Sequence, residues 1–462
     1  MKAISLLTGA ILYSAFSYGQ YFEKTQSLTS GKNPLTLKVV DYNNDGLLDI
    51  LAPGHDDRKI TIYINKGNRT FSDTMFYTST SGINCIATGD LNKDGKVDVV
   101  LGSNWEYKMS LFTGDGKNGD DFTADIQTLD YFPSEDPLAI GDVDNDGKGD
   151  LVFILPDKNN YYKIQFYHGN GSGLFDTVTT SSLINTFGQN KMTLADFNND
   201  GYLDVAQITV AVGGIDIYLF NPITKKFNFS ESYPIYGSTK ERIIHGDFNG
   251  DGKTDLAVSS SSKASISIIY GNNDGTFSTA KNIITTTPNF SNEGITALNL
   301  NNDSYSDFVC VSEASDSVLL FLSDNLGEYT ESVVTTLSKG ITNIVSGDID
   351  KDGYPDLIIP NSLNNKVEIL YGKKYTTPTE IKKVDEQNKI EISQLNGNIT
   401  INGVEDGVYL VSLTAIDGKV LDSKQISSLN KQLTLSSDLH SGMYIITIKG
   451  VGIVESKKII IR

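Results

Sequence analysis

One nine-residue pattern of acidic and amide side chains recurs along most of the chain. In its regular form it has Asp at position 1, Asp or Asn at position 3, Asp at position 5, Gly at position 6 and Asp at position 9. Oxygens at positions 1, 3, 5 and 9 can converge on one cation, while the glycine permits a sharp turn and position 7 can add its backbone carbonyl. The pattern contains no His or Cys, so it favours a hard cation, and calcium fits better than magnesium, which retains more of its water.

The seven copies begin at Asp41, Asp90, Asp142, Asp196, Asp247, Asn299 and Asp348. The candidate calcium ligands are Asp41, Asn43, Asp45, Asp49, Asp90, Asn92, Asp94, Asp98, Asp142, Asp144, Asp146, Asp150, Asp196, Asn198, Asp200, Asp204, Asp247, Asn249, Asp251, Asp255, Asn299, Asn301, Asp303, Asp307, Asp348, Asp350, Asp352 and Asp356. Asp, Asn and Gly are also common turn residues, but a turn does not require the Asp at position 9. The sixth copy has Asn299 at position 1 and Ser304 in place of the glycine, so we expect it to bind calcium most weakly or not at all.

The spacing of the copies indicates the elements that carry them. Successive copies start 49 to 54 residues apart, which implies one structural unit per repeat. Each copy is flanked by short β-branched runs without a helical period, and a further run follows, as at 60–64, 215–219 and 266–270. Four strands per repeat and seven repeats predict an all-β protein with a seven-bladed β-propeller.

The two ends of the repeat region predict how the ring closes. Residues 21–30 resemble the fourth strand of a repeat but precede the first copy, whereas the last repeat has no such strand after 366–371. We therefore predict that the N-terminal strand completes the seventh blade. This arrangement leaves no unpaired sheet edge at the junction of the ring.

The charge of the chain is concentrated in the repeats. The 462 residues carry a formal charge of −19, from 57 acidic and 38 basic side chains. Residues 376–462 hold ten of each, which leaves 47 acidic and 28 basic side chains in the first 375 residues. Such a surface is a poor match for nucleic acid or anionic lipid. Seven divalent ions would reduce the net charge from −19 to −5.

The first residues are typical of an export signal. A basic start, an apolar run over 3–16 and small residues at 17–19 predict a signal peptide over residues 1–19, cleaved before Gln20. About 14 apolar residues are too few to span a bilayer, and no later segment is apolar enough to do so. We therefore expect export and no transmembrane segment.

The repeats resemble a known family. The acidic loops, followed by turns such as the one at 270–277, resemble FG-GAP/VCBS repeats, as in integrin α-subunit propellers, over residues 20–374. The resemblance implies calcium in loops between the first and second strands, on one face of the disc. It also implies ligand recognition by loops on the opposite face. The candidates there are Arg58, Trp105, Tyr107, Tyr161 and Tyr162, although these aromatic residues could instead cover blade edges.

The neutral C-terminal region has a different character. A polar linker over 375–388 precedes short strand-like runs that predict a small β-sandwich over 389–462. By composition alone this unit could be a carbohydrate-binding or immunoglobulin-like module. The segments 407–411, 416–420, 441–448 and 457–462 resemble the type A sorting domain of the type IX (Por) secretion system. That resemblance implies a type IX secretion partner and export to the medium or outer surface of a Bacteroidetes-type bacterium.

These features favour a secreted or surface-displayed calcium-binding propeller that binds a glycan or protein ligand, as in adhesion, without catalysis. A polysaccharide lyase-like enzyme and a purely structural surface protein are the alternatives. The sequence holds no GxSxG or HExxH motif, and His245 lies in a first-strand position where packing is expected rather than proton transfer.

The two cysteines, Cys85 and Cys310, lie in strand-like runs, so we expect both to be buried free thiols.

Overall fold

A computed structural model describes most of the chain. It covers residues 21 to 461 except 78–81, 104, 106–107, 115–122, 126–137, 157–161, 183–190, 210–212, 238–241, 288–289, 325–326, 374–390, 396–397, 403–407, 416–419, 428–431, 437–441 and 451–452. The predicted signal peptide (residues 1–19) and almost all of the predicted linker (375–388) lie outside this part. The chain divides into two compact units, Met1–Tyr375 and Thr376–Arg462.

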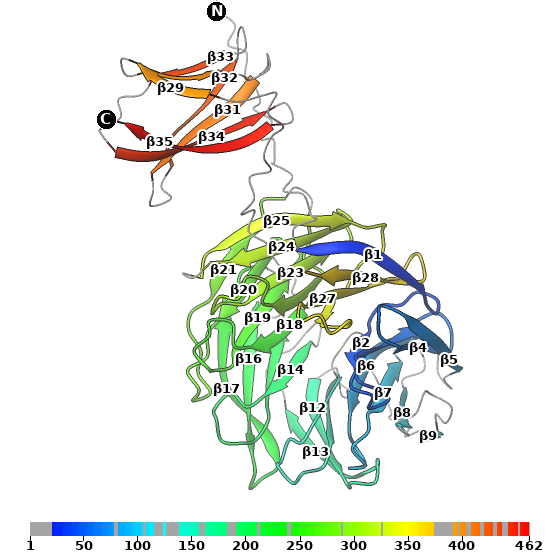
Figure 1. The fold of residues 1–462 in the computed structure, drawn as a ribbon. Coiled ribbons are helices and arrows are strands. Elements are labelled where there is room, and N and C mark those ends of the chain that lie inside the picture. The colour runs from blue at the N-terminus through cyan, green and yellow to red at the C-terminus, as the bar shows by residue number, and fades with distance from the viewer. Residues whose placement is uncertain are drawn as a thin grey trace, which may run out of the picture. The chain divides into compact units, whose positions relative to one another are not determined.

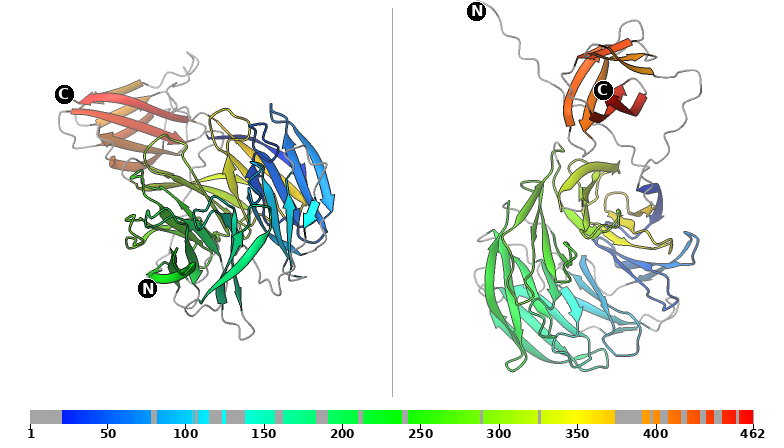
Figure 2. Two further views of the ribbon diagram at one scale, coloured as in Figure 1. Left: turned by 90° about the horizontal axis from the view of Figure 1, so that it is seen from below. Right: turned by 60° about the vertical axis from the view of Figure 1, so that its left-hand side comes forward.

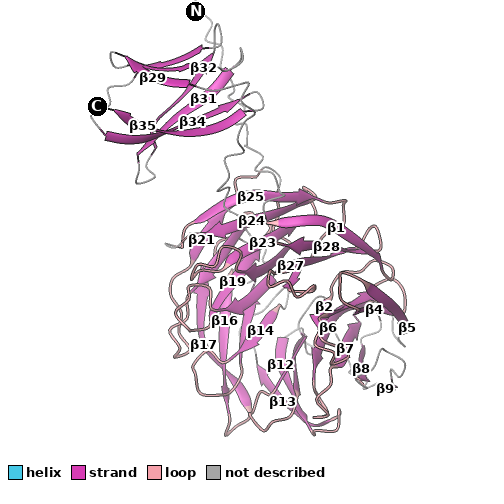
Figure 3. Cartoon of the chain, in the orientation of Figure 1, coloured by secondary structure: helices cyan, strands magenta, loops and turns pink. Residues whose placement is uncertain are grey.

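The first unit is a seven-bladed β-propeller, as predicted (Figure 1). Every blade is a four-stranded antiparallel sheet, and the described residues contain strands, turns and loops but no helix (Figure 3). The first three blades are β2 (Lys38–Val40), β3 (Asp49–Gly54), β4 (Lys59–Asn65), β5 (Phe71–Tyr77); β6 (Ile83–Gly89), β7 (Asp98–Ser103), β8 (Lys108–Thr113), β9 (Thr123–Asp125); and β10 (Leu138–Gly141), β11 (Asp150–Pro156), β12 (Tyr162–Gly169), β13 (Phe175–Ser182).

The remaining blades repeat this order. They are β14 (Met192–Ala195), β15 (Asp204–Thr209), β16 (Gly214–Asn221), β17 (Lys226–Pro234); β18 (Arg242–Gly246), β19 (Asp255–Ser260), β20 (Ser265–Ile269), β21 (Lys281–Ile284); β22 (Gly294–Leu298), β23 (Asp307–Ser312), β24 (Ser317–Ser323), β25 (Tyr329–Thr336); and β26 (Val345–Gly347), β27 (Asp356–Asn361), β28 (Lys366–Gly372).

The N-terminal strand closes the ring. Strand β1 (Phe22–Thr29) pairs antiparallel with β28 and supplies the fourth strand of the seventh blade (Figure 1). Phe22 is 1% exposed and belongs to a core cluster that joins the sixth and seventh blades. The predicted closure by residues 21–30 is therefore confirmed.

The core of the propeller lies between neighbouring blades. Seven clusters of buried side chains join each blade to the next, and the cluster that contains Ile50 and Ile358 joins the seventh blade to the first. The second strands β3, β7, β15, β19, β23 and β27 are buried along their whole length. Because both faces of a blade are covered, these strands carry continuous apolar runs rather than alternating ones. The further views in Figure 2 show the blades arranged around an axis.

The second unit consists of two sheets. One contains β29 (Glu391–Leu395), β30 (Asn398–Asn402) and β33 (Gln432–Ser436), and the other contains β31 (Val408–Ala415), β32 (Val420–Ser427), β34 (Gly442–Gly450) and β35 (Ile453–Ile461). Sequence reasoning missed β32, whose second half is polar. Ile401 from the first sheet and Val411, Ile446 and Ile448 from the second are buried. Packing of the two sheets as a sandwich stays a prediction.

Candidate functional site

The acidic loops connect the first strand of each blade to the second. The first copy, for example, begins at Asp41 just after β2 and ends at Asp49, the first residue of β3. Since every blade has the same strand order, the seven loops lie on one face of the disc, which we call the acidic face. The loops between second and third strands, and the connections between blades, lie on the other face.

The backbone of the loops is folded by their own side chains. Position 4 adopts a positive φ in all seven loops, and the glycine at position 6 does so in six. In the fourth loop, Asp196 accepts hydrogen bonds from the N–H groups of Asp200 and Gly201 at 3.2 and 2.8 Å. A Cβ atom at Gly95, Gly252 or Gly353 would meet nothing within 4 Å, so the backbone conformation and not crowding requires glycine there.

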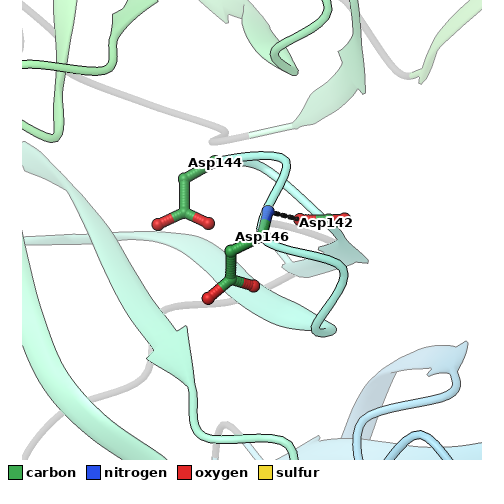
Figure 4. A group of neighbouring side chains, drawn as sticks. All are labelled: Asp142, Asp144 and Asp146. Carbon is green, nitrogen blue, oxygen red and sulfur yellow. Dashed lines mark hydrogen bonds between the residues drawn. The ribbon is translucent and has the colours of Figure 1, made fainter.

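Carboxylates converge at positions 1, 3 and 5 in two loops. The groups are Asp142, Asp144 and Asp146 in the third blade and Asp348, Asp350 and Asp352 in the seventh, each with oxygens within 4.8 Å of one another. Figure 4 shows the first group on one tight loop, where the N–H of Asp146 donates to Asp142. Calcium binds oxygen at about 2.3–2.6 Å, so oxygens that share one ion lie within about 5 Å of each other. The donor chemistry and the spacing therefore both fit calcium.

The other five loops have Asn at position 3, and in each of them the Asn oxygen accepts a hydrogen bond from the N–H at position 5. Asn43 and Asn198 accept a hydrogen bond from the N–H at position 5 and donate one to the carboxylate there. At position 3 these loops therefore offer an amide oxygen in place of a carboxylate, with one negative charge fewer than the third and seventh loops have there.

The aspartate at position 9 has a role that sequence reasoning missed. Asp204 is fully buried, and its two oxygens accept hydrogen bonds from the N–H groups of Phe197 (3.0 Å) and Phe220 (2.8 Å). All seven position-9 side chains are buried and make the same pair of bonds to backbone N–H groups, one in the loop and one at or just after the end of the third strand. Each of these aspartates thus ties its acidic loop to the third strand of its blade.

Burial makes these position-9 carboxylates harder to ionise. It raises the pKa of Asp204 and Asp356 to about 7, and that of Asp49, Asp150 and Asp255 to about 6, although the backbone hydrogen bonds oppose the effect. The other carboxylates of the same loops raise these pKa values further. A cation bound in the loop would oppose this rise, because it favours the ionised form.

The two loops with the most carboxylates also receive a basic side chain from the next blade. Lys225, in the hairpin between β16 and β17, lies 2.8 Å from Asp144 of the preceding blade. Arg69, in the hairpin between β4 and β5, lies 2.7 Å from Asp350 of the seventh blade. Only the loops of the third and seventh blades have Asp at position 3, so these cations lie where the negative charge is highest. They link neighbouring blades on the acidic face.

The sixth loop differs from the others in its hydrogen bonds as well as its sequence. Ser304 does not adopt the positive φ of the glycines at this position. The carboxylate of Asp303 accepts hydrogen bonds from the Asn301 amide (2.8 Å) and the Ser323 hydroxyl (3.2 Å). The Asn299 amide donates to the backbone carbonyl of Asp303. The other six loops have Asp at position 1, which cannot donate as Asn299 does, so this last bond is particular to the sixth loop. Weaker calcium binding by this loop stays a prediction.

The opposite face carries a half-exposed aromatic side chain. Trp105, between β7 and β8, is 54% exposed and packs against Gly82, where an added Cβ would lie 2.4 Å from the indole. The ring of His55, from the first blade, meets the indole edge-on at 4.7 Å.

Arg58 is exposed in the same interstrand loop as His55. Tyr107 and Tyr161 lie outside the described residues, and Tyr162 begins β12 without a described side chain.

Other groups named from the sequence can also be placed. Cys85 and Cys310 are buried free thiols, as predicted. Burial raises the pKa of Cys85 to about 12, which makes it a poor nucleophile. No helix that could cross a membrane is found in the part of the chain that the structure describes.

Comparison with protein families identifies both units. The sequence model of the FG-GAP-like repeat matches residues 41–101, 90–153, 142–206, 247–310 and 299–359. These matches cover more than half of the chain. The model of the secretion system C-terminal sorting domain matches residues 396–462.

Individual relatives are more distant. The chain is 24% identical over 404 residues to a T-cell immunomodulatory protein homolog of Plasmodium yoelii yoelii, covering 81% of this chain and 50% of the relative. It is 25% identical over 406 residues to the homolog of Plasmodium falciparum (isolate 3D7), covering 76% and 54%. The chain thus spans about half the length of these relatives. Among solved structures, the Dos1 propeller aligns with a TM-score of 0.47 at 11% identity, covering 74% of this chain and 79% of that one.

Proposed function

The chain belongs to the FG-GAP-like repeat family, and from this premise we propose that it is an exported, calcium-stabilised propeller whose face opposite the acidic loops binds an extracellular glycan or protein. Its C-terminal sorting domain marks it for secretion or display at the cell surface. The proposed partners are therefore a type IX secretion apparatus at the C-terminal unit and a ligand at the propeller.

The observation that carries the calcium proposal is the convergence of Asp142, Asp144 and Asp146 within 4.8 Å, matched in the seventh blade. Three carboxylates this close repel one another unless a cation lies among them. Lys225 pairs with Asp144 at 2.8 Å and Lys148 pairs with Asp146 at 2.6 Å, so neither ion pair joins all three carboxylates. In the regular loops, the side chains at positions 1, 3 and 5 would hold the ion.

The role proposed for calcium is structural. The ion would neutralise the carboxylates of a loop, while the position-9 aspartate fixes the same loop to the third strand. Asp204, for example, reaches Phe220 on β16. Each ion would thus stabilise the connection between the first and second strands and the pairing that follows it. In this role the metal maintains the blade and takes no part in a reaction.

The proposed ligand-binding face rests on Trp105. An indole that is 54% exposed yet supported from behind by Gly82 offers a flat surface on which a sugar ring or a peptide side chain can stack. The contact with His55 holds the indole edge in place. Because these residues come from the first and second blades, the surface depends on the arrangement of the two blades and not on one loop alone.

Metal analysis of the purified mature chain tests the calcium proposal. After dialysis against calcium, elemental analysis should find about six ions per chain, because the sixth loop has Asn299 in place of the position-1 carboxylate and its Asp303 accepts a bond from the Ser323 hydroxyl. Treatment with EDTA should lower the melting temperature and increase proteolysis, and added calcium should restore both. The proposal is wrong if no calcium is retained and EDTA changes neither property.

The ligand half of the proposal is tested separately, with glycan and protein arrays. Trp105→Ala should lose binding that the wild-type chain shows. Phe229→Ala is the matched control, because Phe229 is 38% exposed on the outer strand β17, far along the chain from Trp105. Equal binding by both variants would remove Trp105 from the site, and new unsaturated sugar ends would indicate a lyase instead.

A further inference from the structure

The seven first strands surround a cavity on the axis of the propeller. Its volume is about 350 Å³, and its lining includes residues from all of β2, β6, β10, β14, β18, β22 and β26. We call it the axial cavity. This volume lies within the range of small-molecule sites, roughly 300–1,000 Å³.

The charge of the axial cavity is opposite to that of the whole protein. Among the described residues, three Lys and Arg side chains line it: Lys38 from the first blade, Lys191 just before β14 in the fourth, and Arg242 at the start of β18 in the fifth. No Asp or Glu is among the described residues that line it. The chain as a whole has a net charge of −19, so a central cavity whose described ionisable side chains are all basic points to an anionic occupant.

The basic residues gather toward one end of the cavity. Lys191 and Arg242 each lie five residues before the first aspartate of their repeat, and Lys38 lies three residues before Asp41. At about 3.3 Å per residue in a strand, they are roughly 10–17 Å along the strand from the acidic loops. They therefore lie toward the face that carries Trp105.

The side chains of Lys38 and His245 contact the solvent inside the cavity, although the ring of blades surrounds them. Both side chains are exposed to solvent within the cavity, whereas Lys191 is only 4% exposed. Burial within the ring lowers the pKa of Lys38, and the positive charge of Arg242 lowers it further. Lys38 and Arg242 come from the first and fifth blades, so basic groups from separate parts of the ring act on each other across the cavity.

Neutral hydrogen-bonding groups accompany these cations. The Nδ1 atom of His245 lies 2.5 Å from the hydroxyl of Thr193, and burial lowers the pKa of His245. Thr36 and Asn343 are buried, and the Asn343 amide lies 3.4 Å from the Thr36 hydroxyl. The remaining lining is largely aliphatic, as at Ile86, and so would cover the apolar part of a ligand.

We propose that the axial cavity binds a small ligand through an oxyanion (a carboxylate, sulfate or phosphate group) held by Lys38, Lys191 and Arg242. This inference rests on the proposed ligand-binding function and extends it by naming the chemical class of one ligand and its position. It does not depend on calcium. An Arg guanidinium and a Lys ammonium are the usual partners of such anions, and in an enclosed site their hydrogen bonds to the anion are stronger than in open water.

The inference is tested by titrating the full mature chain with sodium glucuronate, inorganic sulfate and inorganic phosphate, and with glucose as the neutral probe. We expect calorimetry to detect binding of at least one anion at one site per chain and no binding of glucose. Lys38→Met combined with Arg242→Met should weaken that binding by about tenfold or more, because each lost charge-assisted hydrogen bond is a substantial part of the affinity. The anion that binds most tightly identifies the group that the cavity takes.

Lys226→Met is the matched control, because Lys226 is exposed on β17 and does not line the cavity. It should bind the anion as the wild-type chain does. Lys191→Gln provides a second cavity variant in case the double variant does not fold, which its melting curve shows. The inference is wrong if the wild-type chain binds none of the three anions, or if folded cavity variants bind as tightly as Lys226→Met. Metal content and array binding are measured independently, so either proposal can fail alone.

Discussion

The aspartate at position 9 of each repeat combines a buried charge with two backbone hydrogen bonds. Asp204 accepts one bond from the loop and one from β16, and it is fully buried. Seven such residues repeat this connection around the ring. An aspartate is needed because each of its two oxygens accepts a hydrogen bond, whereas an asparagine would present an N–H group to one of the two donors.

Asp204→Asn should therefore destabilise the protein even without metal. We expect a loss of about 1–3 kcal/mol in the free energy of unfolding, the usual result of leaving a buried donor unsatisfied. The measurement is urea unfolding in EDTA, at a pH above the pKa of about 7 that burial gives Asp204. Because this pKa lies above the usual value of 3.8, wild type should gain stability as the pH falls from about 7 towards 4, whereas Asp204→Asn should not, so the difference between the two proteins should widen.

Asp200→Asn is the control for this experiment, because it removes the same charge from the same loop. The Asp200 side chain is exposed to solvent, and its Oδ1 atom accepts from the N–H of Tyr202, which an asparagine oxygen can also do. The bond that it accepts from the Asn198 amide would be lost, but water can replace it at this exposed site. It should change stability in EDTA by less than about 0.5 kcal/mol but reduce the gain that calcium gives. If Asp204→Asn were as stable as wild type in EDTA, the structural role of position 9 would be wrong.

The local pattern predicted where these residues lie but not everything that they do. The spacing of oxygens at positions 1, 3 and 5 is encoded within nine residues, so their convergence could be foreseen. The partner of Asp204 on β16 is 16 residues further along, and the partner of Asp144 is Lys225 in the next blade. Contacts of this kind depend on strand register and blade packing, which a short motif does not contain.

At the scale of elements, ring closure depends on strand β1. The strand pairs with β28 in register from Thr25 to Thr29, opposite Leu370 to Lys366, and buries Phe22 between the sixth and seventh blades. It joins the first described residues of the propeller to the last strand of the ring. Without this strand the edge of β28 would be open to solvent, and an open edge is a site for pairing with other chains.

Phe22→Ala should lower the free energy of unfolding of the propeller by about 3–5 kcal/mol, because it leaves a cavity in a closely packed cluster. Urea unfolding followed by tyrosine and tryptophan fluorescence gives the value. Ile284→Ala is the comparison, because Ile284 is 54% exposed on the outer strand β21 and should change stability little. Similar effects of the two substitutions would contradict a closure role for β1.

The closing strand could be predicted because it has the composition of the fourth strands and occurs where a repeat is incomplete. Strand β32 could not, since Val420–Ser427 reads largely as polar residues after a turn. It pairs with β31, whose other edge is paired with β34, so its position depends on partners distant in sequence.

The basic residues of the axial cavity could not be predicted from the sequence either. Lys38, Lys191 and Arg242 lie far apart along the chain and come to line one cavity only when the ring closes.

At the scale of the whole molecule, the acidic face concentrates negative charge. The seven loops hold 22 of the 47 acidic side chains of the first 375 residues, all on one face of the disc. Six divalent ions would change the net charge of the chain from −19 to −7. Like charges close together on a compact surface oppose folding. The stability of the metal-free protein should therefore depend on salt, which screens these charges, more than the stability of the calcium-loaded protein does.

The melting temperature in EDTA should therefore rise with sodium chloride, whereas that of the calcium-loaded protein should change much less. Between about 0.01 and 1 M salt the Debye length falls from about 30 to about 3 Å, so repulsion within and between loops is largely removed over this range. Differential scanning calorimetry of both forms gives the two slopes, and glycerol in place of salt controls for effects unrelated to charge. Equal slopes would mean that the loops are already neutralised without calcium, and the charge of the acidic face would then have to be balanced by contacts such as those of Lys225 and Arg69.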